Sequence, residues 1–148
     1  MSIRSASSKT KKILFELERD AYVVWSPDSA SLMVEDQFTA DETRLMLFRL
    51  SFVAPRDEQG LSIDRVIRAA AVKSLRKDER MAYYYPDVIG WDAGMWFVEV
   101  GITTTHGETG PFIRHCLGYV VDAKVGRVTQ SLSRYDLKKR FGATCHAD

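Results

Sequence analysis

Residues 96–132 decide the fold: WFVEVGITTTHGETGPFIRHCLGYVVDAKVGRVTQSL. Over 96–103 and again over 112–121, large apolar side chains occupy alternate positions, which is the period of a strand with one buried face. The segment 122–126, DAKVG, predicts a tight hairpin turn whose glycine takes a positive φ. Residues 127–132 would return beside the second strand. The sequence therefore predicts a three-stranded antiparallel meander.

An amphipathic helix is predicted just before this meander, over residues 62–77. Ser62 would cap its first turn. One stripe carries its apolar or small side chains: Ile63, Val66, Ile67, Ala70, Ala71, Ser74 and Leu75. A sheet of this kind needs cover on its apolar face, and this helix would supply it. A shorter helix is predicted over 134–141, capped by Ser133 and stopped by Gly142.

The N-terminal half is less decisive. The run from Tyr22 to Trp25 is typical of a strand. The segment Thr39-Ala40-Asp41-Glu42 resembles a capping box, which would start a helix reaching about Leu47. A strand over residues 44–53 is the alternative, and periodicity does not decide between them.

Composition favours one globular domain. The chain has 148 residues, 45% of them hydrophobic and 28% charged, which is ordinary for a soluble protein. We expect a single α+β domain over 1–148, in which a curved antiparallel sheet packs on one main helix. Residues 1–9 would be a flexible leader and 142–148 a flexible tail.

Charge is unevenly distributed although the formal net charge is only +1. Both ends of the chain are basic, whereas residues 13–123 carry eleven basic and eighteen acidic side chains. The basic ends are too sparse for a typical phosphate-binding patch, so a nucleic-acid partner is not expected.

Targeting signals and cysteines point to the cytoplasm. No apolar run is long enough to cross a membrane, and the basic N-terminus is not followed by a signal-peptide core, so no membrane association is expected. The two cysteines, Cys116 and Cys145, are interpreted as free thiols in a reducing compartment.

The order of a helix followed by a meander resembles small bacterial immunity-type proteins of the cystatin-like and NTF2-like kind. The residues that carry this resemblance are Trp96-Phe97-Val98-Glu99-Val100, Gly110-Pro111 and Gly118-Tyr119-Val120-Val121-Asp122-Ala123-Lys124-Val125-Gly126-Arg127-Val128. Where the family pattern usually ends its hairpin with Thr-Gly, this chain has Val125-Gly126. The resemblance covers less than half of the chain, and it implies a protein that binds and blocks another protein.

Aromatic residues crowd the segment 81–95, MAYYYPDVIGWDAGM. Tyrosine and tryptophan are favoured anchors of protein interfaces, and three adjacent tyrosines cannot all point inward. We therefore predict a contact surface made by this segment and the loop 103–111, with an acidic rim suited to a basic partner protein. Its predicted residues are Tyr83, Tyr84, Tyr85, Asp87, Trp91, Asp92, His106 and Glu108.

A pocket on the sheet is the alternative interpretation. Glu99, His115 and Tyr119 are its candidate residues, because a buried acid or histidine in an apolar pocket can take a tuned pKa. This pocket would serve a small-molecule-binding protein or an enzyme. A homo-oligomeric structural subunit, such as a homodimer, is a third interpretation.

No catalytic motif stands out, and a non-catalytic role is favoured. Neither the Ser-His-Asp order nor a phosphate-binding glycine pattern occurs in the sequence. Histidine and cysteine spacings do not match a zinc motif, so neither a metal site nor a cofactor is predicted.

Overall fold

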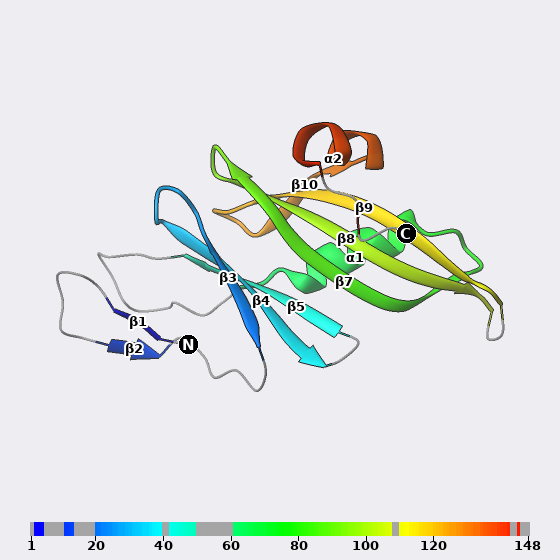
Figure 1. Cartoon of the computed structure of the whole chain (residues 1–148), viewed down its shortest axis with the longest axis horizontal. Coiled ribbons are helices and arrows are strands. Elements are labelled where there is room, and N and C mark those ends of the chain that lie inside the picture. The colour runs from blue at the N-terminus through cyan, green and yellow to red at the C-terminus, as the bar shows by residue number, and fades with distance from the viewer. Residues whose placement is uncertain are drawn as a thin grey trace.

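The computed structural model describes residues 2–4, 11–13, 20–39, 42–49, 61–107, 110–142 and 145. Their elements, in chain order, are β1 (Ser2–Arg4), β2 (Lys11–Ile13), β3 (Ala21–Trp25), β4 (Ser31–Thr39), β5 (Glu42–Arg49), β6 (Leu61–Ser62), α1 (Asp64–Ser74), β7 (Glu79–Asp92), β8 (Met95–His106), β9 (Phe112–Asp122), β10 (Arg127–Leu132) and α2 (Arg134–Phe141). The α+β class is confirmed, with two helices and a predominance of strand (Figure 1).

Eight of the strands form one sheet, in the order β10-β9-β8-β7-β5-β4-β3, with β6 paired to β5. The predicted meander corresponds to β8, β9 and β10, and β7 extends it by one long antiparallel strand. β7 then meets β5 in parallel at the pair Glu42 and Tyr84. β1 and β2 form a separate two-stranded sheet.

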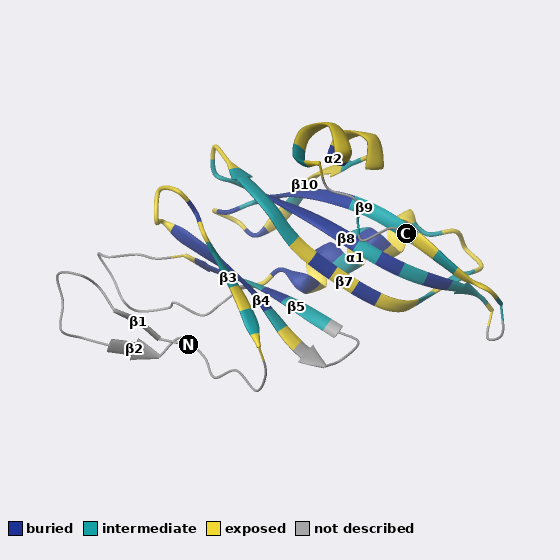
Figure 2. Cartoon of the chain, in the orientation of Figure 1, coloured by how far each residue is buried: buried dark blue, intermediate teal, exposed yellow. Residues whose placement is uncertain are grey.

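The side of the β7–β9 sheet that faces α1 is its inner face. There the predicted alternation is confirmed. Trp96, Val98 and Val100 alternate along β8 and are all buried, and Val98 pairs with Tyr119 of β9. Helix α1 completes this core with Ile67 and Ala71 (Figure 2). The opposite side is the outer face.

Helix α1 is shorter than predicted and begins differently. Ser62 belongs to β6 and pairs with Met46, so it does not cap the helix. Ile63 occupies the N-cap position without a side-chain cap. The buried stripe is also narrower, since Val66 is exposed and the burial runs through Ile63, Ile67 and Ala71.

The capping box expected at Thr39 is wrong. Thr39 and Glu42 instead face each other as a cross-strand pair at the end of the β4–β5 hairpin. The alternative strand is the observed structure, although β5 covers Glu42–Arg49. Its predicted face, with Leu45 and Leu47, is buried in the core. Residues 51–53 of the predicted strand lie outside the described part.

The C-terminal predictions are confirmed. Gly126 has a φ of 64° in the β9–β10 turn, and Gly142 ends α2 with a φ of 66°. Ser133 and Asp136 cap α2 reciprocally. Helix α2 lies on the outer face, where the ring of Phe141 packs 4.9 Å from that of Phe97, measured between centroids.

Both described helices are too short to cross a membrane.

Candidate functional site

A groove of about 400 Å³ opens on the outer face of β7, β8 and β9. We call it the outer groove. It is lined by Tyr83, Tyr85, Asp87, Glu99, Gly101, Ile102, Thr103, Phe112, Arg114, His115 and Cys145.

Strand geometry explains why these residues meet. In an antiparallel sheet, residues directly opposite each other on neighbouring strands project to the same side. Asp87 lies opposite Glu99, and Tyr85 lies opposite Gly101, which in turn lies opposite Cys116. Because Gly101 has no side chain, it leaves room between the larger residues on either side of it, Tyr85 and Cys116. The groove therefore follows from the register of three strands.

Aromatic rings line one end of the groove. Tyr83 and Tyr85 are two residues apart on β7 and stack with centroids 6.4 Å apart, and Tyr83 lies 6.0 Å from Phe112 on β9. All three side chains are exposed, at 36%, 42% and 65% respectively. Three exposed aromatic side chains on one face form an apolar patch of the kind that marks interaction sites.

Carboxylates occupy the other end of the groove. Glu99 is only 6% exposed and faces Asp87 across the β7–β8 ladder. Like charges placed directly opposite each other repel, so a cation bound here would relieve the repulsion. Arg114 supplies the only basic side chain among the lining residues that the structure describes, apart from the histidine.

A third carboxylate reaches the acidic end from β4. Glu35 is buried, and its Oε1 accepts a hydrogen bond from the backbone N–H of Val88, which follows Asp87. The pKa of Glu35 is raised to about 7, chiefly by burial; the hydrogen bond from Val88 opposes this rise and the nearby Asp87 charge adds to it. Glu35 thus carries a proton for much of the time at neutral pH.

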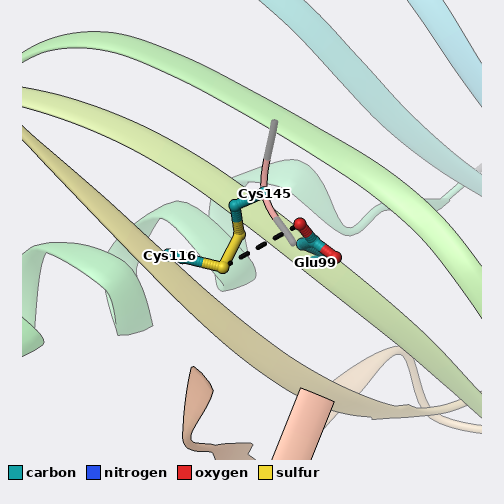
Figure 3. Close-up of side chains that lie close together, drawn as sticks. All are labelled: Glu99, Cys116 and Cys145. Carbon is teal, nitrogen blue, oxygen red and sulfur yellow. Dashed lines mark hydrogen bonds between the residues drawn. A yellow bond between two sulfur atoms is a disulfide. The ribbon is translucent and has the colours of Figure 1, made fainter. Parts of the chain in front are cut away.

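The disulfide between Cys116 and Cys145 corrects the prediction of two free thiols. It attaches residue 145, within the tail expected to be flexible, to the middle of β9 (Figure 3). The two cysteines are 29 positions apart in the sequence, and only the folded chain brings them together. The thiol argument for a reducing compartment therefore no longer applies.

Three of the eight predicted contact residues line the outer groove: Tyr83, Tyr85 and Asp87. Tyr84 is corrected, because it is 1% exposed, whereas Trp91 is half-buried and packs edge-on against the buried Trp96. The strand alternation that turns Tyr83 and Tyr85 outward turns Tyr84 inward.

Two of the remaining three predicted contact residues, Asp92 and His106, lie at strand ends. Asp92 forms an ion pair with Arg140 of α2 at 3.1 Å, and His106 contacts Asp78 at 3.0 Å. Neither lines the groove. Glu108 lies outside the described residues.

The alternative pocket does not form as one site. Glu99 faces the outer groove, whereas Tyr119 is buried in the inner core. His115 borders the groove, but its Nε2 lies 2.9 Å from Thr104 Oγ1 and 3.5 Å from the Glu79 carboxylate. The three residues belong to two faces of the sheet, so they cannot act together.

Sequence reasoning missed Phe112, Arg114 and Cys145 as groove residues. The first two share the alternation of Cys116 along β9, so the signal was present once β7 was identified as a strand. Comparison of the chain with protein-family models, with curated proteins and with solved structures found no match.

Proposed function

We propose that this protein is a non-catalytic binding module that holds a basic segment of another protein in the outer groove. The observation that carries the proposal is the pairing of exposed aromatic rings with two carboxylates around one cavity of about 400 Å³. Such a groove offers apolar and cation–π contacts to the stem of an arginine or lysine and a negative charge to its head.

Tyr85 and Phe112 are the proposed anchors. Rigid aromatic side chains bury a large area while few rotatable bonds are frozen, which is why they dominate interface energetics. Asp87 and Glu99 would add charge complementarity, which favours a basic partner and speeds association. The acidic character of residues 13–123 supports the same choice of partner.

A blocking role, as an inhibitor or immunity protein, is the finer form of this proposal. Its support is the packing of α1 on one face of an antiparallel sheet, which agrees with the cystatin-like or NTF2-like resemblance. A non-catalytic role is supported by the sequence, in which neither the Ser-His-Asp order nor a phosphate-binding glycine pattern occurs.

We also retain the cytoplasm as the proposed location. A cytosolic pool of this protein would be exposed to glutathione and thioredoxin, which keep most thiols reduced. The location therefore requires that the fold be stable with Cys116 and Cys145 in the reduced state.

Capture from host lysate with quantitative mass spectrometry tests the proposal. Tyr85→Ala or Phe112→Ala should weaken binding of the captured partner by about 2 kcal/mol, roughly 30-fold, at a true anchor. Asp87→Asn should weaken it more at low salt than at high salt, because screening already reduces the charge contribution at high salt.

Tyr22→Ala is the matched control, since Tyr22 is an exposed tyrosine on β3, outside the groove. Partner binding that survives the groove substitutions unchanged, in chains that remain folded, would contradict the proposal. Binding lost equally in the Tyr22 variant would mean that the groove is not the contact surface.

A small organic cation is a second candidate for the same groove. The volume of about 400 Å³ lies in the range of ligand pockets, and its acidic end would take a guanidinium or ammonium group. Calorimetric titration with arginine methyl ester separates this candidate from the protein partner. Light scattering in the same buffers tests the homodimer, which would place the groove against a second copy.

A further inference from the structure

Three side chains of metal-binding type converge beside the outer groove, and two of them, Glu99 and Cys145, line it. Glu99 projects from β8 and Cys116 from β9, and Cys145 lies against them on the outer face (Figure 3). Their ligand atoms all lie within 4.8 Å of one another, and Glu99 is buried while both cysteines are half-buried. Within the described residues, this is the group that could hold a metal ion.

The oxidation state of the cysteines decides what this group can do. In the disulfide, each sulfur is bonded to the other and neither offers a thiolate. A phosphine reductant breaks the S–S bond: the phosphorus takes up oxygen from water and becomes a phosphine oxide, and the two sulfurs become thiols. Each thiol can then lose a proton to a metal ion and act as a soft thiolate ligand.

The geometry of the reduced group suits a tetrahedral ion. Zinc binds sulfur at about 2.3 Å and carboxylate oxygen at about 2.0–2.2 Å, so these two ligand atoms are roughly 3.6 Å apart around one ion. Cys116 Sγ already lies 3.9 Å from Glu99 Oε1. This is a contact rather than a hydrogen bond in the oxidised chain, because a disulfide sulfur carries no hydrogen.

The second sulfur is also within reach. Two thiolates on a tetrahedral zinc ion stand roughly 3.8 Å apart. The Cα atoms of Cys116 and Cys145 are 5.4 Å apart, so rotation of the two side chains can open that separation once the bond is broken. The open groove leaves room for a water molecule as fourth ligand.

The negative charge of the reduced group also favours a zinc ion. Glu99 and two thiolates would concentrate three negative charges beside Asp87, which lies directly opposite Glu99. Among the described residues that line the groove, Arg114 is the one basic side chain apart from the histidine. A divalent cation would neutralise most of the negative charge that the three ligands bring.

We propose that the reduced protein binds one zinc ion through Glu99, Cys116 and Cys145, and that formation of the disulfide abolishes this site. Oxidised glutathione would oxidise the two thiolates by thiol–disulfide exchange: its own S–S bond breaks and takes up two electrons, two glutathione thiolates leave, the Cys116–Cys145 bond forms, and the zinc ion is released. This inference does not depend on the proposed protein partner.

Titration of the full chain tests the inference. The protein is reduced with a phosphine, freed of metal, and titrated with zinc in competition with a chromophoric chelator. One equivalent is expected to bind in the reduced state and none in the oxidised state. Cobalt in place of zinc should give the sulfur-to-metal charge-transfer absorption that reports thiolate ligands.

Variants assign the ligands. Glu99→Gln and Cys145→Ser should each weaken zinc binding at least about 100-fold, because losing even a residue that merely orients a ligand costs about 10–100-fold. Asp92→Asn is the matched control, since this carboxylate lies at the end of β7 and pairs with Arg140, and it should leave the zinc affinity unchanged.

Zinc binding that is equal in the reduced and oxidised chains, or a cobalt complex without sulfur absorption, would overturn the inference. So would an unchanged affinity in the Cys145→Ser variant. Circular dichroism of each variant shows whether it is folded. If Cys145→Ser does not fold, the wild-type comparison between redox states still decides the question.

Discussion

Glu35 is the residue whose protonation couples the acidic end of the groove to stability. The pKa of Glu35 is raised to about 7 in the folded chain, first by burial and then by Asp87, against 4.5 for an ordinary glutamate. Between these two values, the folded chain holds a proton that the unfolded chain has released. Raising the pH through this window therefore lowers the free energy of unfolding, and the loss is complete above about pH 7.

Glu35→Gln should remove this loss. The amide oxygen can still accept the Val88 hydrogen bond, and no charge is left to repel Asp87. We expect the variant to exceed the wild type in stability by about 1–3 kcal/mol at pH 8, since each pKa unit corresponds to about 1.4 kcal/mol. The gain should shrink towards zero near pH 4.5.

Urea denaturation at pH 5 and pH 8 measures both differences. Asp36→Asn is the control for losing one carboxylate from β4. A Glu35→Gln gain that is the same at both pH values would show that the effect is not the titration of this side chain.

The sequence predicted several of the residues that line the groove, but it did not predict the direction in which every side chain points from its strand. Tyr83, Asp87 and Glu99 were chosen for their chemistry, and all three line the groove. The inward direction of Tyr84 was missed because Pro86 and Gly90 made the segment look irregular. A proline fits within β7 because its missing N–H matters little where few ladder bonds form, and the pairing with β5 is described only at Tyr84.

Among the elements, helix α2 depends on one close approach to the sheet. A Cβ atom on Gly118 of β9 would lie 2.6 Å from Leu137 Cδ2 and 2.9 Å from Leu132 Cβ. Leu137 is fully buried by this contact although most of α2 is exposed. The glycine therefore sets how near the helix can lie to the outer face.

Gly118→Ala should displace α2 and destabilise the fold by about 1–3 kcal/mol, the usual cost of overpacking a tight contact. Urea denaturation gives the loss, and the NMR shifts of Leu137 report the displaced helix. Gly101→Ala is the matched control, because among the described residues its added Cβ would meet the backbone oxygen of Tyr85 alone, at 3.8 Å. An equal loss of stability in both variants would mean that the destabilisation comes from replacing any glycine in these strands, and not from the contact between Gly118 and α2.

Local signals predicted the C-terminal elements because packing agrees with them there. The Ser133 cap and the Gly142 stop mark both ends of α2, and Gly126 marks the hairpin. The pattern Thr39-Ala40-Asp41-Glu42 failed as a helix signal, because Thr39 and Glu42 are paired residues of two antiparallel strands. The neighbouring strand residues decided the outcome by burying Leu45 and Leu47 on one face.

Across the whole molecule, the sheet has a seam that no local pattern could predict. β3, β4 and β5 form one part and β7 to β10 the other, and the described strand pairing between them is a single parallel pair, Glu42 with Tyr84. The disulfide was missed for a similar reason, since only the assembled sheet brings Cys145 to Cys116. Pairings between distant parts of the chain depend on tertiary structure.

The core nevertheless crosses this seam. Met33, Leu45 and Leu47 come from β4 and β5, yet they belong to one buried cluster with Trp96 of β8 and with Ile67 of α1. Apolar burial shared by both parts penalises the unfolding of either part alone, because the other would expose its half of the cluster to water. The chain should therefore unfold as one cooperative unit, as expected for a single domain.

Unfolding of the Trp25→Phe variant in urea tests this cooperativity. The fluorescence of its two remaining tryptophans, Trp91 and Trp96, reports on β7 and β8, whereas far-UV circular dichroism reports on the strands of both parts. Coincident midpoints and slopes are expected from the two signals. If β3, β4 and β5 were an independent unit, part of the dichroism change would occur at a urea concentration where the fluorescence stays constant. Because Trp25 is half-exposed at the sheet edge, its replacement should leave the midpoint seen by dichroism close to that of the wild type.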